Sequence, residues 1–405
     1  MTAETPILIA GAGIGGLATA LALAKRGLAC HVIEKRARPS EDGAGIQIGP
    51  NGVHVLRQLG VADALSPLTA SPDFLRIMDA MRGRELASLP LGKTIAARFD
   101  APYWTAHRAD LHAALLAGVQ SNPLLKVSLG AEVIGATSYP SHARVSLSNG
   151  AHIDGPALIA ADGLWSGARD LIFMSPPLQD TGSRAYRTVI PASQMPGGVS
   201  ATSTHIWLGP RAHVVHYPVR AGTEIALVAV FADGEMAAGW SNDVAAADLN
   251  ARFSQLAGPL RDVLMHASAW RGWRLLTLPN LPEWQRAWVN GRIALLGDAA
   301  HPVLPFLAQG AVMALEDAVV IAGHIARALQ PKTISMHEAL TNYAAERRPR
   351  TDRVARAAQR NGKTYHLTGA FAAARNTVLR SSPPQRLLAR YDWLYGWRSD
   401  PRMDQ

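Results

Sequence analysis

A glycine-rich turn near the N-terminus satisfies the pattern G-x-G-x-x-G with the residues Gly11, Ala12, Gly13, Ile14, Gly15 and Gly16. It follows a short apolar run and opens a stretch of strong helix formers, which is the setting that this pattern requires. There the first glycine permits a tight bend, the second lets the backbone approach a pyrophosphate, and the last lets helix and strand pack closely. Backbone N–H groups at the start of the helix favour an anion. The turn therefore predicts a bound dinucleotide.

An acidic residue, Glu34, ends the next strand-like run. A carboxylate at this place can accept hydrogen bonds from the ribose hydroxyls of the adenosine half. It would repel a 2′-phosphate, because two anions would then meet at one site. The dinucleotide held by this turn is therefore expected to be FAD or NAD.

Two later blocks distinguish between these cofactors. The first reads D-G-x-x-S-x-x-R through Asp162, Gly163, Ser166 and Arg169, and the second carries Gly297-Asp298 followed by Ala-Ala-His-Pro. An NAD dehydrogenase would instead continue into a second βαβ half. The three blocks, in this order, resemble the single-component FAD-dependent aromatic hydroxylase family from residue 6 to residue 330.

The resemblance implies a set of FAD contacts. Asp162 would lie near the pyrophosphate with Arg169 holding the block in shape, and Asp298 would accept from a ribitol hydroxyl. Arg108, in an H-R-x-x-L segment, would contact the phosphates, or alternatively pair with Asp110. The N–H groups of a helix start would face the pyrimidine end of the flavin. The further cofactor residues are Lys35, Gly45, Ile46, Gln47, Val133, Gly310, Ala311 and Val312.

Within the family, the chain is most similar to the branch of salicylate, 3-hydroxybenzoate and 6-hydroxynicotinate hydroxylases. That similarity implies a small hydroxylated aromatic or heteroaromatic carboxylate as substrate. It also implies FAD as bound cofactor, NADH or NADPH as co-substrate, and molecular oxygen that forms an electrophilic flavin C4a-hydroperoxide.

Electrophilic attack needs an electron-rich ring, so the site must remove or polarise a phenolic proton. His213 and Tyr217 are the candidates for this catalytic role, because residues four apart in a strand share one face. A histidine suits proton transfer near neutral pH. His216 points to the other face and is expected to be structural. The alternatives are that His213 is a polar residue at a strand edge and Tyr217 a core aromatic.

Three further residues are candidates for the substrate pocket. Pro305 and Phe306 follow the Gly297-Asp298 block and would face the ring. Some relatives have a polar residue near Phe306, so an apolar one weakens the expectation of polar substrate contacts there. Arg187 could bind a carboxylate, although an interdomain salt bridge is an equal alternative.

Composition limits the other functions. The chain has 405 residues, a formal net charge of +9 and a single cysteine, Cys30, which is expected to be a core side chain in a reducing compartment. Six arginines between residues 347 and 360 predict a solvated helix face rather than a nucleic-acid site. We expect a cytoplasmic monomer or homodimer with no membrane or nucleic-acid partner. A metal is not expected at His301, because no second ligand lies at helical spacing.

The predicted fold is mixed α/β: a Rossmann-like FAD-binding domain interrupted by a β-sheet substrate domain, with a helical C-terminal part. The FAD-binding domain is assigned residues 1–75, 98–180 and 271–330. The substrate domain takes 76–97 and 181–270, and 331–405 form the C-terminal helices. Asn51 is expected to cap a helix that runs to Leu59, and a long helix is expected from Gln309 to Leu329.

Two other functions fit the same scaffold. One is an FAD-dependent monooxygenase of a larger substrate, such as an epoxidase or a polycyclic hydroxylase; a halogenase is disfavoured because Trp270 and Trp273 have the wrong spacing. The other is a non-catalytic FAD-binding protein, which would bind FAD without oxidising NADH or NADPH in the presence of any aromatic ligand.

Overall fold

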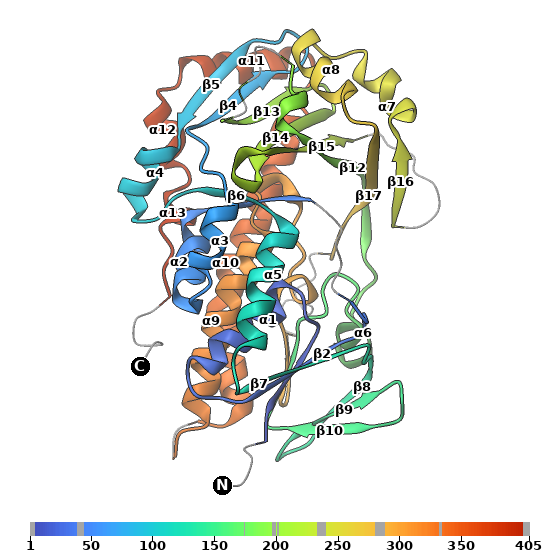
Figure 1. Ribbon diagram of the computed structural model, residues 1–405, viewed down its shortest axis with the longest axis vertical. Coiled ribbons are helices and arrows are strands. Elements are labelled where there is room, and N and C mark those ends of the chain that lie inside the picture. Colours follow the sequence, from blue (N-terminus) through green and yellow to red (C-terminus); the bar gives the residue numbers. More distant parts are fainter. Residues whose placement is uncertain are drawn as a thin grey trace.

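The protein is described by a computed structural model, which defines residues 5–38, 44–173, 175–196, 200, 202–232, 240–279, 288–331 and 334–399. Its architecture is mixed α/β, as predicted, with a six-stranded sheet in the lower part of Figure 1 and an eight-stranded sheet in the upper part. Long helices run beside the lower sheet and reach the upper one. Each sheet packs its own hydrophobic core.

The six-stranded sheet has the order β18-β19-β11-β1-β2-β7. Its central strands pair in parallel and are almost fully buried, which is the pattern of strands covered on both faces. The strand bounds are β1 Ile7–Ala10, β2 Cys30–Glu34, β7 Leu125–Leu129, β11 Leu158–Ala160, β18 Val289–Asn290 and β19 Ile293–Leu295.

Helices cover one face of this sheet and a small sheet covers the other. The helical layer contains α1 (Ile14–Ala24), α5 (Arg108–Gln120) and α9 (Gly310–Ala328). The small sheet is built from β8 (Val133–Ser138), β9 (Ala143–Leu147) and β10 (His152–Gly155), with a hairpin turn between β9 and β10. The glycine-rich turn thus lies at the carboxyl end of β1, a central strand that is buried between two layers.

The eight-stranded sheet has the order β16-β17-β12-β15-β14-β13-β4-β5. The pairs are antiparallel except for β13 with β4. The bounds are β4 Phe74–Asp79, β5 Glu85–Pro90, β12 Gln179–Pro191, β13 Thr204–Gly209, β14 Ala212–Val219, β15 Glu224–Phe231, β16 Ser241–Ala245 and β17 Ala269–Thr277. One face packs against α7 (Ala246–Phe253) and α8 (Gly258–Met265). The other face turns toward the six-stranded sheet and its helices.

The remaining elements connect and brace the two sheets. A two-stranded ribbon pairs β3 (Gly45–Ile48) with β6 (Trp104–His107). The C-terminal part is helical, as predicted, and its first helix, α10 (Met336–Tyr365), is capped by the Ser335 side chain and extends beside α9 to the upper sheet (Figure 1). The other helices are α2 Pro50–Leu59, α3 Ala62–Leu65, α4 Gly92–Phe99, α6 Gly167–Phe173, α11 Gly369–Ser381, α12 Pro384–Ala389 and α13 Asp392–Tyr395.

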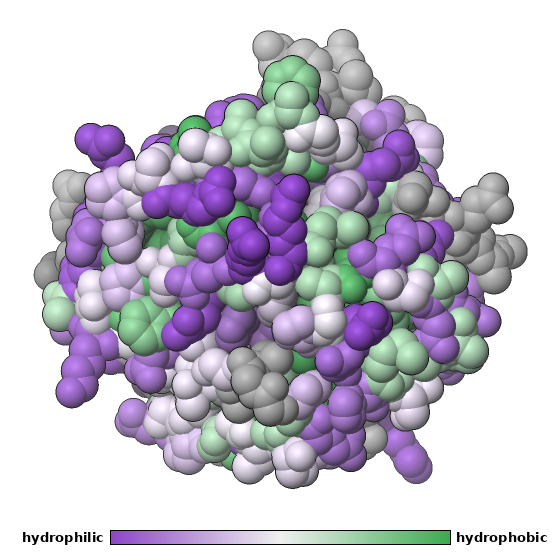
Figure 2. Space-filling model, turned by 90° about the horizontal axis from the view of Figure 1, so that it is seen from above, coloured by the Kyte–Doolittle hydropathy of each residue, from purple (hydrophilic) through white to green (hydrophobic). Residues whose placement is uncertain are grey.

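Within the described residues, no helix combines the length and apolarity needed to cross a lipid bilayer. The face seen in Figure 2 mixes hydrophilic and hydrophobic side chains in small groups. Cys30 is buried in β2, as predicted for a core side chain. Burial raises the pKa of its thiol to about 12.

Candidate active site

The glycine-rich turn joins β1 to α1 with almost no spare volume. Gly11 has φ +99°, and a Cβ there would lie 2.6 Å from the carbonyl oxygen of Ala161. A Cβ on Gly16 would lie 2.0 Å from the carbonyl oxygen of Gly11. At Gly13, by contrast, a Cβ would meet nothing within 4 Å, so this position opens onto a cavity. Gly11 and Gly16 thus have the packing roles that the motif predicted.

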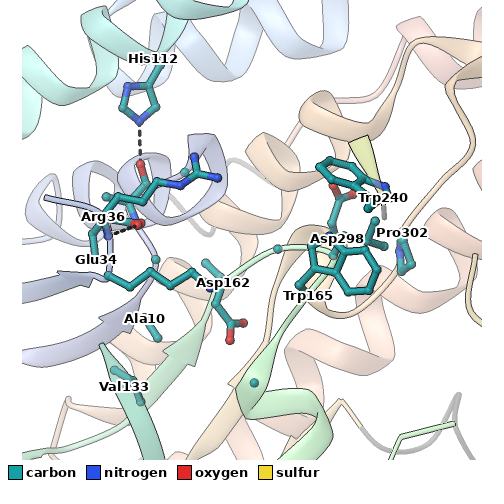
Figure 3. A pocket seen from close by; sticks show the side chains of 18 of the residues that line it. Ala10, Glu34, Arg36, His112, Val133, Asp162, Trp165, Trp240, Asp298 and Pro302 are labelled. Carbon is teal, nitrogen blue, oxygen red and sulfur yellow. Dashed lines mark hydrogen bonds between the residues drawn. The ribbon is translucent and has the colours of Figure 1, made fainter. Parts of the chain in front are cut away.

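Glu34 is fixed at the edge of the same turn. Its carboxylate accepts hydrogen bonds from the backbone N–H groups of Ala12 at 2.8 Å and Arg36 at 2.9 Å. On the other side, the imidazole of His112 bonds the carbonyl oxygen of Ala12 at 2.7 Å (Figure 3). His112 was not predicted, because its partner lies 100 residues away and nothing in its own helix marks it.

A cavity of about 620 Å³ begins at this turn. Figure 3 shows Glu34, His112 and Val133 around one part of it and Trp165, Trp240 and Asp298 around another, with Asp162 between them. Ten predicted site residues line it: Gly11, Ala12, Gly13, Glu34, Lys35, Arg108, Val133, Asp162, Asp298 and Pro305.

Other predicted residues lie outside the lining of this cavity. Ile14, Gly15 and Gly16 belong to the turn and the first turn of α1, and Gly15 packs on Leu296. The remaining ones lie on β3, β12 and β14, in the turn that begins at Pro305 and in the first turn of α9: Gly45, Ile46, Gln47, Arg187, His213, Tyr217, Phe306, Gly310, Ala311 and Val312. The structure thus divides the predicted residues into a cavity set and a set beside the eight-stranded sheet.

The two carboxylates within the cavity suit a ligand rich in hydroxyl groups. Burial raises the pKa of both Asp162 and Asp298. The Oδ1 atom of Asp162 is buried and has no hydrogen-bond partner among the described residues. A buried acceptor without a partner is costly, so this atom fits a donor that a bound ligand brings. The glycine turn, Glu34 and these acids together match the groups of FAD.

Arg169 holds the loop that carries Asp162, as the resemblance implied. The guanidinium is buried and donates to the carbonyl oxygens of Leu164 at 2.6 Å and Ala299 at 3.5 Å. Arg169 therefore links the loop that carries Asp162 to the Gly297-Asp298 block. In the same region, Asp110 pairs with Arg220 at 3.4 Å, and Arg108 lines the cavity.

The N-terminus of α9 is fixed by a side chain whose role was predicted wrongly. Gly49, not Asn51, caps α2, and Pro50 takes its first position. The buried Asn51 amide instead donates to Gln309, the N-cap of α9, at 3.1 Å and to Glu316 at 2.8 Å. The long helix itself, α9, has the predicted bounds to within one residue at each end.

The arginine cluster of α10 also departs from expectation. Arg347 is 1% exposed and contacts Glu316 at 2.9 Å and Asp317 at 2.7 Å, while Arg350 bonds Glu316 at 2.5 Å. The prediction that the arginines of this helix face solvent is wrong for Arg347 and Arg350, because their acidic partners lie on α9, inside the protein. Burial alone would raise the pKa of Asp317, but His301 and Arg347 lower it to about 2.

The lower face of the eight-stranded sheet carries His213, Tyr217 and Arg187. Strand register places Val215 of β14 and Arg187 of β12 on either side of Val228 of β15. His213 and Tyr217 share this face, as the period-two pattern predicted, while His216 lies on the opposite face and stacks on His205 at 4.4 Å. The Arg187 guanidinium lies 5.0 Å from the centre of the Trp273 ring, a cation–π contact that was not predicted.

His213 packs in an aromatic cluster. Its ring centre lies 5.4 Å from Phe306 and 5.3 Å from Tyr365, and its Nδ1 atom is 2.8 Å from Nε2 of His366. Burial, and then the neighbouring His366, hold the pKa of His213 well below its usual range. Tyr365 and His366 come from the end of α10, and sequence reasoning missed both of them.

Tyr217 lies under the β3 ribbon. A Cβ on Gly45 would be 2.5 Å from its ring and 2.4 Å from Ala226, so only glycine lets β3 approach the sheet this closely. Gln47 interacts with the Tyr217 hydroxyl and accepts a bond from Tyr103 at 2.6 Å. Burial raises the pKa of Tyr217, which keeps its hydroxyl protonated as a hydrogen-bond donor.

Comparison with known proteins gives the same picture. Residues 4–358 match the protein family described as "FAD binding domain". The chain is 36% identical, over 96% of its length and 97% of the relative, to 3-hydroxybenzoate 6-hydroxylase 1 of Aquipseudomonas alcaligenes. It is 32% identical, over 98% of its length and 96% of the relative, to 3-hydroxybenzoate 6-hydroxylase of Polaromonas naphthalenivorans (strain CJ2). A salicylate hydroxylase–substrate complex shares the fold with TM-score 0.82 and 22% identity, covering 100% of this chain and 99% of that one.

Proposed function

The chain belongs to the family of FAD-dependent aromatic hydroxylases, and on this premise we propose that it hydroxylates a small phenolic carboxylate, with 3-hydroxybenzoate as the first candidate. The relatives at 36% and 32% identity are named for that compound, and another at 34% identity is named 3-amino-4-hydroxybenzoate 2-monooxygenase. When bound, FAD supplies oxygen activation with NADH or NADPH as the reductant.

One observation carries the substrate assignment: a histidine, a tyrosine and an arginine share one face of the eight-stranded sheet. With about 3.3 Å per residue and about 4.8 Å between strands, the Cα atoms of His213 and Tyr217 are about 13 Å apart. The Cα of Arg187 is then about 12 Å from each of them. The apolar side chains of Val215 and Val228 lie on the same face between them.

Each of the three residues has a distinct part in this proposal. His213 takes up the phenolic proton, because an electron-rich phenolate is needed for electrophilic hydroxylation. Tyr217 donates a hydrogen bond that orients the substrate hydroxyl, and Arg187 binds the carboxylate. Phe306 and Pro305 contact the ring and keep water from it.

The predicted cofactor residues receive parts that follow from their positions. We assign the glycine-rich turn and Arg108 to the pyrophosphate, and Glu34, Lys35 and Val133 to the adenosine half. Asp298 would accept a hydrogen bond from a ribityl hydroxyl, and Asp162 would lie near the pyrophosphate region. Gly310, Ala311 and Val312, at the N-terminus of α9, would hold the pyrimidine edge of the flavin, and Gly45, Ile46 and Gln47 of β3 would hold its ribityl side.

We further propose that the enzyme works in the cytoplasm, as a monomer or homodimer without a nucleic-acid partner. The single buried thiol of Cys30 supports this location, because secreted proteins more often carry disulfides.

The experiment measures NADH and NADPH oxidation by the FAD-loaded protein with a panel of hydroxybenzoates and hydroxypyridine carboxylates. Hydroxylated product and hydrogen peroxide are measured together. We expect one phenolic acid to accelerate oxidation and to yield product with little peroxide. If FAD binds but no compound changes either rate, the assignment to small aromatic acids is wrong, and larger substrates come next.

A further inference from the structure

His213 has to pass on any proton that it accepts. Its ring is 4% exposed, and burial disfavours the imidazolium form. A buried imidazole can still move a proton without becoming charged, if one nitrogen gains a proton while the other gives one up. That requires an acceptor on the second nitrogen and a route from this acceptor to the surface.

His366 provides both. Its Nε2 atom lies 2.8 Å from Nδ1 of His213, so one ring donates and the other accepts. His366 is the C-cap of α10 and is partly exposed, whereas His213 is buried. The backbone fixes its position, since its N–H donates to Gly362 at 3.2 Å and its carbonyl oxygen accepts from the N–H of Arg211 at 3.3 Å.

We propose that His213 and His366 form a two-histidine relay that carries the phenolic proton of the substrate to the protein surface. This inference rests on the proposed function and assigns His366 as the positioning residue that acts through His213. The reactant tautomer of His213 has its proton on Nδ1, held toward Nε2 of His366, which leaves Nε2 of His213 to meet the substrate hydroxyl.

The transfer balances without a charged imidazole. The phenolic O–H bond breaks as an N–H bond forms at Nε2 of His213. The Nδ1–H bond of His213 breaks as an N–H bond forms at Nε2 of His366, whose Nδ1 proton passes to water. The outcome is a phenolate, two neutral rings and one proton in solvent. A product that leaves as a neutral phenol takes its proton back along the same path and resets both tautomers.

The charged groups around the pair favour a neutral relay over a stored positive charge. Arg211 lies at the β13–β14 turn next to the His366 carbonyl. Arg375 of α11 donates to the carbonyl oxygens of Thr364 at 2.9 Å and Tyr365 at 2.8 Å. Asp79 opposes these cations, but its carboxylate is engaged by the amide of Asn376 at 3.2 Å. Tyr365, which also faces His213, stays neutral because burial raises its pKa.

The kinetic test compares three variants of the holoenzyme with 3-hydroxybenzoate and saturating NADH between pH 6 and pH 9. In His366→Phe we expect kcat at pH 7 to fall by about 100-fold, the lower range of general base catalysis. It should recover as pH rises toward the phenol pKa of about 10, where the substrate ionises unaided. KM should change by less than a factor of two.

The variant His366→Gln tests whether His366 passes on a proton or only holds the His213 ring in place. Its amide can still bond Nδ1 of His213 but cannot pass a proton, so we expect the same loss as in the phenylalanine variant. Imidazole in the buffer should restore turnover to His366→Ala, and the proton inventory of the wild type in mixed water and heavy water should be curved. Wild-type turnover in His366→Gln, or an unchanged pH profile in His366→Phe, would overturn the relay.

A second measurement does not need turnover. In holoenzyme labelled with ¹⁵N-histidine, NMR should find His213 as the Nδ1–H tautomer, with a hydrogen-bonded proton signal that disappears in His366→Phe. The opposite tautomer, with the proton on Nε2, would refute the relay even if no phenol were turned over. Failure of the wild type with every phenol, together with the expected tautomer, would instead point to an error in the proposed substrate. FAD absorbance and Tm establish that each variant folds.

Discussion

Strand β14 carries two histidines, His213 and His216, on opposite faces of the eight-stranded sheet, and the two differ in what their rings contact. His213 bonds His366, a partly exposed group, on the lower face. His216 stacks on His205 on the upper face, at 4.4 Å, beside the buried ring of Trp207. All three rings of this upper group are at most 4% exposed.

His213, His216 and His205 are all buried, and burial lowers the pKa of each of them, that of His205 to about 4. Burial and a shifted pKa therefore do not separate a catalytic histidine from a structural one. The difference is the neighbour: His213 bonds a partly exposed histidine that offers a proton an exit, whereas His205 and His216 stack on each other beside Trp207, with the Arg76 cation next to His205. Perturbed titration points to function only when such a route accompanies it.

The largest expected effect comes from replacing His213 and His216 separately with phenylalanine, which removes the ring nitrogen atoms from one face of the sheet at a time. His213→Phe keeps a ring of similar shape but no base, so we expect kcat for hydroxylation to fall by about 10²–10³-fold. His216→Phe should leave turnover within a factor of two. Steady-state NADH oxidation with product quantification measures both. Equal losses in the two variants would show that connection to the surface does not matter.

The His205–His216 pair should make the folded protein less stable in acid. The unfolded histidine titrates near pH 6.5, while His205 in the folded chain titrates near 4. Between these values the unfolded state binds a proton that the folded state refuses, so stability is complete above about pH 6.5 and falls as pH decreases toward 4. The loss for His205 alone is about 3 kcal/mol.

Urea unfolding at several pH values checks this slope. In His205→Leu, the decline between pH 6.5 and 4 should become shallower than in the wild type. A variant that keeps the full wild-type slope would assign the acid sensitivity to other groups.

Arg187 lies on the same face as the connected pair and should affect binding rather than chemistry. In Arg187→Gln we expect KM for 3-hydroxybenzoate to rise by about 10- to 100-fold, since a charged hydrogen bond to a carboxylate contributes about 1.5–3 kcal/mol. Oxidation of NADH stimulated by a phenol without a carboxylate should change little. Equal effects on both ligands would favour a structural role for the contact with Trp273.

Cys30 gives the smallest expected effect, because it too is a buried titratable group without an exit. With its pKa raised to about 12, the thiol is protonated at pH 8. Labelling by a disulfide reagent should proceed much more slowly in the native protein than in urea, and holoenzyme activity should not change during it. Rapid native labelling would show that this strand opens more readily than its packing suggests.

The parts of the site that sequence predicted well are those governed by local rules. The glycine-rich turn is recognisable because three neighbouring backbone requirements coincide within six residues. The shared face of His213 and Tyr217 follows from the alternation of a strand. The bounds of α9 follow from its apolar helical pattern.

The errors and omissions arise where the partner is distant in sequence. His366 lies 153 residues after His213, and nothing in the end of a helix announces a bond to a strand. Arg347 was expected in solvent because its own helix is rich in charge, but the acids that bury it lie 30 residues earlier. Asn51 has the side chain of an N-cap, yet its amide is drawn inward by Glu316, 265 residues away.

The strand order of the six-stranded sheet determines how much of the chain must be synthesised before the sheet can be complete. Its first strand, β1, lies in the middle, and its neighbour β11 is completed by β19, which ends at Leu295. At a rate of about 5–20 residues per second, a ribosome needs about 15–60 s before that last strand exists. Until then the nascent chain exposes one edge of β11. The N-terminal fingerprint is thus made first, but the cavity that it lines is complete only after Pro305, about three quarters of the way along the 405 residues, so FAD meets a complete pocket only after that point.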